Sequence, residues 1–167
     1  MSSDAMSLMD YDLFADPVPV ENGVYPLVTC LRSLGCLVLS SCEGHSPHES
    51  GVLFAVEPHV LFLPPAGMAQ IFCSLPSQGF WSQLEWNWMV SVCEHEVHGF
   101  VFRISPARFD LELDRHLRQS PAVQALSLVS RKHALKHYWP TIRASINMDV
   151  ETICRMLPVQ GELSCAS

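Results

Sequence analysis

Apolar residues recur at helical spacing near the beginning of the chain. Leu27, Leu31 and Leu34 lie three and four residues apart, which places their side chains on one face of a helix. Pro26 suits the first turn of such a helix, and Gly35 is the residue type that commonly ends one. The pattern therefore predicts one amphipathic helix in this region.

Short apolar runs after this helix predict strands. The run 36–40 follows the helix directly, and the runs 52–56 and 59–63 are separated by Pro58. A further apolar segment, 66–75, predicts a short helix because it is bounded by prolines on both sides.

Strict alternation predicts a β-hairpin in the middle of the chain. The even-numbered residues of the first strand are large and apolar and are expected to face the core: Trp86, Trp88, Val90 and Val92. A second group repeats the pattern: Phe100, Phe102 and Ile104. The polar stretch 95–99 between them predicts the hairpin turn.

The last third of the chain carries helix signals. Ser105-Pro106 and Ser120-Pro121 each pair a capping residue with a proline at the first helical position. The second of these helices is expected to end at Pro140, and a last helix is expected to begin near Asp149. Together the elements predict an α+β protein, with a small, mostly antiparallel sheet, one N-terminal helix and two or three C-terminal helices packed on it.

A chain of 167 residues is long enough to bury one core. We expect residues 1–20 to form a loose acidic arm and residues 21–105 to form an α/β core that carries the Cys/His loops. Residues 106–167 are expected to be a helical part of the same domain.

The net charge of −7 is unevenly distributed. Residues 1–102 carry −10 and residues 103–167 carry +3. The acidic part would repel a phosphate backbone, which argues against nucleic acid as its partner. The basic part either contacts a partner or packs against the acidic part, and the sequence leaves both open. The longest apolar run has five residues (52–56), which predicts no membrane span.

The cysteines indicate a reducing compartment. Seven cysteines, an odd number, are scattered through the chain, unlike a disulfide framework. The first fourteen residues contain no basic residue, so they lack the positive region of a secretory signal. We therefore expect a cytoplasmic protein.

Two short stretches concentrate residues that bind transition metals, and zinc takes four such ligands tetrahedrally, often as two pairs from separate turns. The ligands predicted from these stretches are Cys42, His45, Cys93 and His95, with His48, His59 and His98 as alternates. Cys93 and His95 share one face of the predicted strand. The alternative is that Cys93 is a core thiol and the histidines are solvated turn residues.

Cys42 and His45 are also candidates for nucleophilic catalysis. A thiol placed where a strand gives way to a turn is accessible, and an imidazolium nearby would lower its pKa. The sequence does not identify a third residue that would orient this pair.

The segment Ser40-Ser41-Cys42-Glu43-Gly44-His45 follows a helix, a glycine and a short strand. This arrangement resembles the N-terminal signature of the wybutosine-synthesis methyltransferase family, in which Ser-Ser-Cys-Ser-Gly-Arg follows the first strand. It also resembles small bacterial and phage proteins of unassigned function that carry Ser-Cys-Glu-Gly-His. The resemblance covers residues 24–63. Glu43 and His45 stand where the methyltransferases have serine and arginine, so a tRNA substrate and S-adenosylmethionine are not carried over.

Three functions follow from these observations. The first is a metal- or ligand-binding protein that uses the Cys/His loops, with zinc as the metal and a small molecule or protein as partner. The second, implied by the resemblance, is an RNA-modifying enzyme. The third is an acidic, non-catalytic interaction or inhibitor protein, of phage or mobile-element origin if the second resemblance holds.

Overall fold

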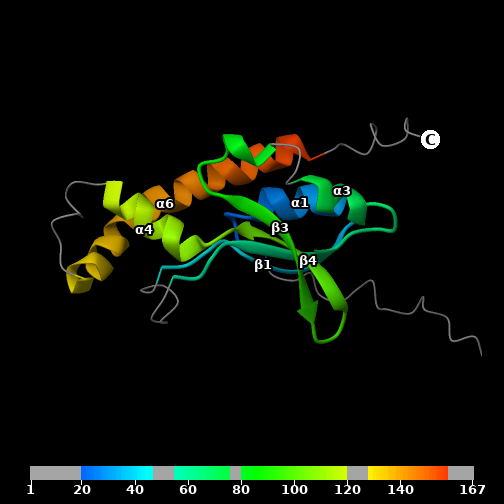
Figure 1. The fold of residues 1–167 in the computed structure, drawn as a ribbon, viewed down its shortest axis with the longest axis horizontal. Helices are drawn as coiled ribbons and strands as arrows, with labels where there is room; N and C mark the ends of the chain where they lie inside the picture. The colour runs from blue at the N-terminus through cyan, green and yellow to red at the C-terminus, as the bar shows by residue number, and fades with distance from the viewer. Residues whose placement is uncertain (1–19, 47–54, 76–79, 120–127, 158–167) are drawn as a thin grey trace, which may run out of the picture.

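One antiparallel sheet of four strands organises the fold, in the order β1-β2-β4-β3 (Figure 1). The strands span Leu37–Cys42 (β1), His59–Leu63 (β2), Trp88–His95 (β3) and Gly99–Pro106 (β4). The structure is a computed structural model and describes residues 20–46, 55–75, 80–119 and 128–157.

A β-bulge interrupts the pairing of β1 with β2. Val38 pairs with Phe62, and the register shifts by one residue before Ser40 pairs with Leu61. After the shift, Ser41 lies opposite the buried Val60, while the next pair, Cys42 and His59, lies on the other face of the sheet.

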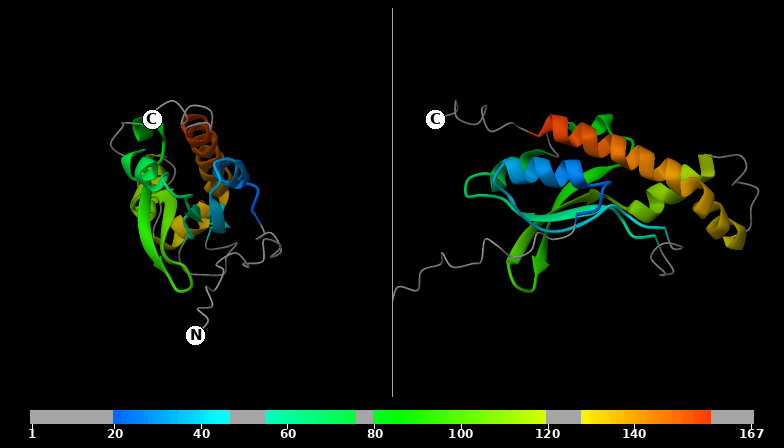
Figure 2. Two further views of the ribbon diagram at one scale, coloured as in Figure 1. Left: turned by 90° about the vertical axis from the view of Figure 1, so that its right-hand side faces the viewer. Right: turned by 180° about the vertical axis from the view of Figure 1, so that it is seen from behind.

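Helices cover one face of this sheet, as the end-on view in Figure 2 shows. They comprise α1 (Tyr25–Ser33), α3 (Ala69–Ser74), the 3₁₀ helix η2 (Phe80–Gln83), α4 (Phe109–Gln119) and α6 (Leu128–Met156). The helix α1 packs against both β1 and the long α6. None of the helices in the described ranges is long and apolar enough to cross a membrane.

The core lies between the sheet and these helices. Its largest fully buried side chains include Trp86, Phe62 and Phe72, and the last two meet edge to face with ring centroids 4.9 Å apart. Leu27 and Leu31 of α1 and Ile146 of α6 complete it from the helical side. The α+β class predicted from the sequence is therefore confirmed.

Most local elements match the predicted ones. The helix α1 carries its proline in the first turn and ends before Gly35, which adopts φ = +80°. The strand β2 has the predicted bounds, and residues 96–98 form the turn between β3 and β4. The predicted strand 52–56 and the Ser120-Pro121 helix start lie largely outside the described residues, as does the arm, apart from Val20.

The predicted burial of the hairpin is wrong at its far end. Trp88 is buried, but Val92 is 52% exposed and Phe100 is 77% exposed. The hairpin extends beyond the helices that cover the rest of the sheet (Figure 1). Its residues alternate as predicted, but Val92 and Phe100 in its outer half are not covered by the residues that the structure describes.

The start predicted for the first C-terminal helix is also wrong. Ser105 and Pro106 pair with Met89 and Trp88 as the last residues of β4, and α4 begins only at Phe109. Strand pairing therefore overrides the local capping signal.

Pro140 does not end a helix, contrary to the prediction. It lies inside α6, which runs without interruption from Leu128 to Met156 and includes the predicted helix start at Asp149. A proline removes one helical hydrogen bond, but Trp139, Ile142 and Ile146 bury their side chains on either side of it. Their burial offsets the lost bond.

Asp149 fastens α6 to the start of β3. Its buried carboxylate accepts hydrogen bonds from the backbone N–H groups of Glu85 and Trp86, at 2.9 and 2.8 Å, and from the indole of Trp88 at 3.0 Å. Burial raises the pKa of this carboxyl, although the three donors act in the opposite direction.

The variant Asp149→Ala leaves three donors at the start of β3 without their acceptor. We expect the free energy of unfolding to fall by about 3 kcal/mol, measured by urea denaturation with tryptophan fluorescence. Glu151→Ala removes a carboxylate from an exposed position of the same helix and should change it by less than about 0.5 kcal/mol. Equal effects of the two variants would contradict the anchoring role of Asp149.

Candidate functional site

Cys42 is the last residue of β1 and lies on the sheet face opposite the core. Its cross-strand neighbour there is His59, the first residue of β2. Both side chains are partly buried. The sequence places them 17 positions apart, and the antiparallel pairing of β1 with β2 makes them neighbours.

The loop after β1 returns His45 toward Cys42. Gly44 adopts φ = +84°, a conformation that favours glycine, and the backbone of His45 then pairs with Val56 through hydrogen bonds of 3.0 and 2.8 Å. A Cβ atom at position 44 would lie 3.1 Å from Pro58, so the turn also leaves little space for a side chain.

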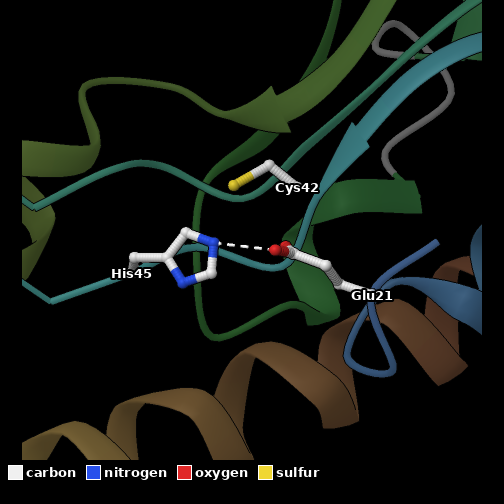
Figure 3. Close-up of side chains that lie close together, drawn as sticks. All are labelled: Glu21, Cys42 and His45. Atoms are coloured by element: carbon white, nitrogen blue, oxygen red, sulfur yellow. Dashed lines mark hydrogen bonds and ion pairs between the residues drawn. The ribbon is translucent and has the colours of Figure 1, made fainter. Parts of the chain in front are cut away.

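Glu21, in the segment that precedes α1, completes the group (Figure 3). Its Oε1 lies 2.9 Å from His45 Nε2, and its Oε2 accepts the backbone N–H of Glu43 at 2.6 Å. The ligand atoms of Glu21, Cys42 and His45 all lie within 4.8 Å of one another.

A second carboxylate supports the group from the helical side. Glu43 accepts the backbone N–H of Gly23 at 2.8 Å and forms an ion pair with Arg143 of α6 at 3.3 Å. Arg143 also donates to the carbonyl of Gly44 at 3.2 Å. A Cβ atom at Gly23 would lie 2.9 Å from that of Glu43, so this close approach requires glycine.

Burial is the main cause that raises the pKa of the Cys42 thiol, and the carboxylates of Glu21 and Glu43 raise it further. The N–H of Gly44, which donates to the sulfur at 3.4 Å, acts in the opposite direction. The thiol is therefore protonated near neutral pH. An activated nucleophilic cysteine needs the reverse, a depressed pKa.

The structure brings together two of the four predicted zinc ligands and separates the other two from them. Cys93 and His95 lie on β3, at the opposite edge of the sheet from β1. Three strand-to-strand steps separate the two edges by about 14 Å. A zinc ion with bonds of about 2.3 Å to sulfur cannot join Cys42 to Cys93 across that gap.

The alternate ligands divide in the same way. His98 lies in the hairpin turn near His95, whose Nδ1 accepts the backbone N–H groups of Val97 and His98 at 3.3 Å. His59 is next to Cys42, but it does not belong to the group within 4.8 Å. His48 lies outside the described residues.

Sequence reasoning missed Glu21. It lies 21 residues before Cys42, between the acidic arm and the first helix, and no spacing relates it to the Cys/His stretches. Only the packing of the segment before α1 against the loop after β1 brings it to the site.

No family model, curated protein or solved structure matches this chain. The resemblance to the wybutosine-synthesis methyltransferases therefore stays a prediction.

The raised pKa of Cys42 predicts slow alkylation. Treated with iodoacetamide at pH 7.5, Cys42 should react at least about threefold more slowly than the exposed Cys73, as followed by peptide mass spectrometry. Glu21→Gln removes a negative charge beside the sulfur and should accelerate the reaction of Cys42 but not that of Cys73. Faster labelling of Cys42 than of Cys73 in the wild type would instead indicate an activated thiolate.

Proposed function

We propose that the protein binds a zinc ion through Glu21, Cys42 and His45. The observation that carries this proposal is the convergence of a sulfur, an imidazole nitrogen and a carboxylate oxygen within 4.8 Å of one another. Ligand atoms around a tetrahedral zinc lie about 3.3–3.8 Å apart, given bonds of about 2.0–2.3 Å. A small contraction of the group would therefore enclose the ion.

The chemistry of the ligands favours zinc over the harder divalent cations. Magnesium and calcium prefer oxygen ligands, whereas thiolate and imidazole suit zinc and related transition metals. The local charge also favours a bound cation. The carboxylates of Glu21 and Glu43 raise the pKa of the Cys42 thiol, and the same negative charges would attract a metal ion.

Contacts around the ligands support the same proposal. The N–H of Gly44 donates to the Cys42 sulfur, and the N–H of Glu43 donates to the Glu21 oxygen that does not face His45. Outer contacts of this kind orient metal ligands and stabilise their charged forms. In this arrangement Oε1 of Glu21 remains directed at the centre of the group.

A fourth ligand is needed to complete a tetrahedral site, and among the described residues His59, the cross-strand neighbour of Cys42, is a candidate. Its Nδ1 lies 3.1 Å from the carbonyl of Glu57, a contact that makes Nδ1 the protonated nitrogen and Nε2 the ligand atom. Burial lowers the pKa of His59, which keeps the imidazole neutral as metal binding requires. A water molecule in place of His59 would leave an open site.

Zinc binding should depend on the loop after β1 and not on the hairpin. For protein purified without a histidine tag, we expect one zinc per chain by elemental analysis and calorimetry. Cys42→Ser and His45→Gln should each weaken binding by more than about 100-fold, since even outer-shell changes weaken it by about 10- to 100-fold.

Cys93→Ser is the matched control, because it removes a partly buried thiol at the other edge of the sheet. Its zinc affinity should equal that of the wild type. Loss of zinc in Cys93→Ser would favour the four-ligand site predicted from the sequence, and absence of stoichiometric zinc in the wild type would reject the proposal.

The proposal also predicts that the affinity for zinc depends on pH. The thiol of Cys42 carries its proton at neutral pH and must release it to bind zinc, so protons and zinc compete. The logarithm of the association constant should rise by about one per pH unit between about pH 6.5 and 8, measured by calorimetry in two buffers. In Cys42→Ser, any residual binding should lose this slope.

A further inference from the structure

A cavity of about 640 Å³ lies between α6 and the end of the loop after β1. Ser46 contributes from the loop, and residues from successive turns of α6, including Lys136, Trp139 and Arg143, form the other wall. Small-molecule sites in proteins occupy about 300–1,000 Å³, so the size suits a small ligand.

Pro140 lines the cavity and lies inside α6. Because proline has no N–H, it leaves the carbonyl of Lys136, four residues earlier, without its usual helical donor. The cationic side chains lie at positions 136 and 143, two helical turns apart and therefore on one face.

The charge of the lining is the opposite of that of the chain. The protein carries −7 overall, yet the described residues that line this cavity include two cations, Lys136 and Arg143, and no carboxylate. Glu43 contacts Arg143 and offsets part of its charge. Lys136, an exposed residue, adds a further positive charge at the cavity.

Arg143 is held in place before any ligand arrives. Its ion pair with Glu43 and its hydrogen bond to the Gly44 carbonyl fix the guanidinium beside the cavity. A side chain that is already ordered loses little entropy on binding, and a guanidinium suits the geometry of oxyanions.

Trp139 supplies a second observation. Its side chain is 3% exposed, and its indole N–H has no hydrogen-bond partner among the residues that the structure describes. Buried donors are normally satisfied, so an unmatched donor next to a cation-lined cavity fits a site whose acceptor comes from a ligand.

From these observations we propose that the cavity binds the oxyanion group, carboxylate or phosphate, of a small molecule through Lys136 and Arg143. The site is distinct from the zinc site and does not rest on it.

The test is an NMR titration of the ¹⁵N-labelled full chain with inorganic phosphate and, separately, with malonate. Sodium chloride at matched ionic strength controls for screening. The indole signal of Trp139, assigned with Trp139→Phe, should shift in a saturable manner. The indole of Trp88, which donates to Asp149, should not move.

Lys136→Gln should weaken binding of the effective anion by up to about fivefold, as expected for loss of an exposed charge contact. The matched control Arg155→Gln removes an exposed cation from the same helix and should bind as the wild type does. Ala144→Phe fills the cavity without changing the charge and should abolish binding.

A saturable shift of the Trp139 indole signal with only one of the two anions supports the proposal. It also identifies the bound group as phosphate or carboxylate. Shifts no larger than those with sodium chloride, or equal affinity in Lys136→Gln and the wild type, would overturn it.

Discussion

The candidate site depends on a reciprocal exchange between two glutamates. Glu21 accepts the backbone N–H of Glu43, and Glu43 accepts the backbone N–H of Gly23. Each carboxylate therefore satisfies a donor on the segment that carries the other. This exchange holds the segment before α1 against the loop after β1, and Arg143 ties both to α6 through Glu43. Hydrogen bonds to charged acceptors are among the stronger ones in proteins, so the geometry of Cys42 and His45 rests on contacts outside the sheet.

The same exchange leaves the site with an excess of negative charge. Of these two carboxylates, Glu43 is paired with an arginine, while Glu21 faces the imidazole of His45. A metal ion among the three ligands would supply the missing positive charge. The cluster is thus suited to one cation, and the zinc proposal follows from its electrostatics as much as from its ligand types.

Patterns within ten or so residues predicted local structure well, and contacts between distant segments explain where they failed. The spacing of Leu27 and Leu31 predicted α1 because that helix buries one face. The helix end predicted at Pro140 was wrong because burial of Trp139 and Ile142 outweighs one lost hydrogen bond in a long helix. For the site, the short loop from Cys42 to His45 could be found from its residue types, whereas Glu21 could not, because only tertiary packing relates it to them. Cys93 was wrongly grouped with Cys42 because the sequence does not specify the order of the strands in the sheet. That order places β1 and β3 at opposite edges.

The bulge in β1 determines which face of the sheet each later residue of the strand occupies. Side chains alternate across a sheet, and Val38 faces the core, so in a regular strand every even-numbered residue after it would do the same. The extra residue between Val38 and Ser40 reverses that assignment, and Cys42 consequently lies beside His59 on the outer face while Ser41 turns inward. A strand of the same length that paired without the bulge would keep the same Cys-Glu-Gly-His segment and turn the thiol toward the core. The chemistry available to that segment thus depends on how β1 accommodates its one extra residue.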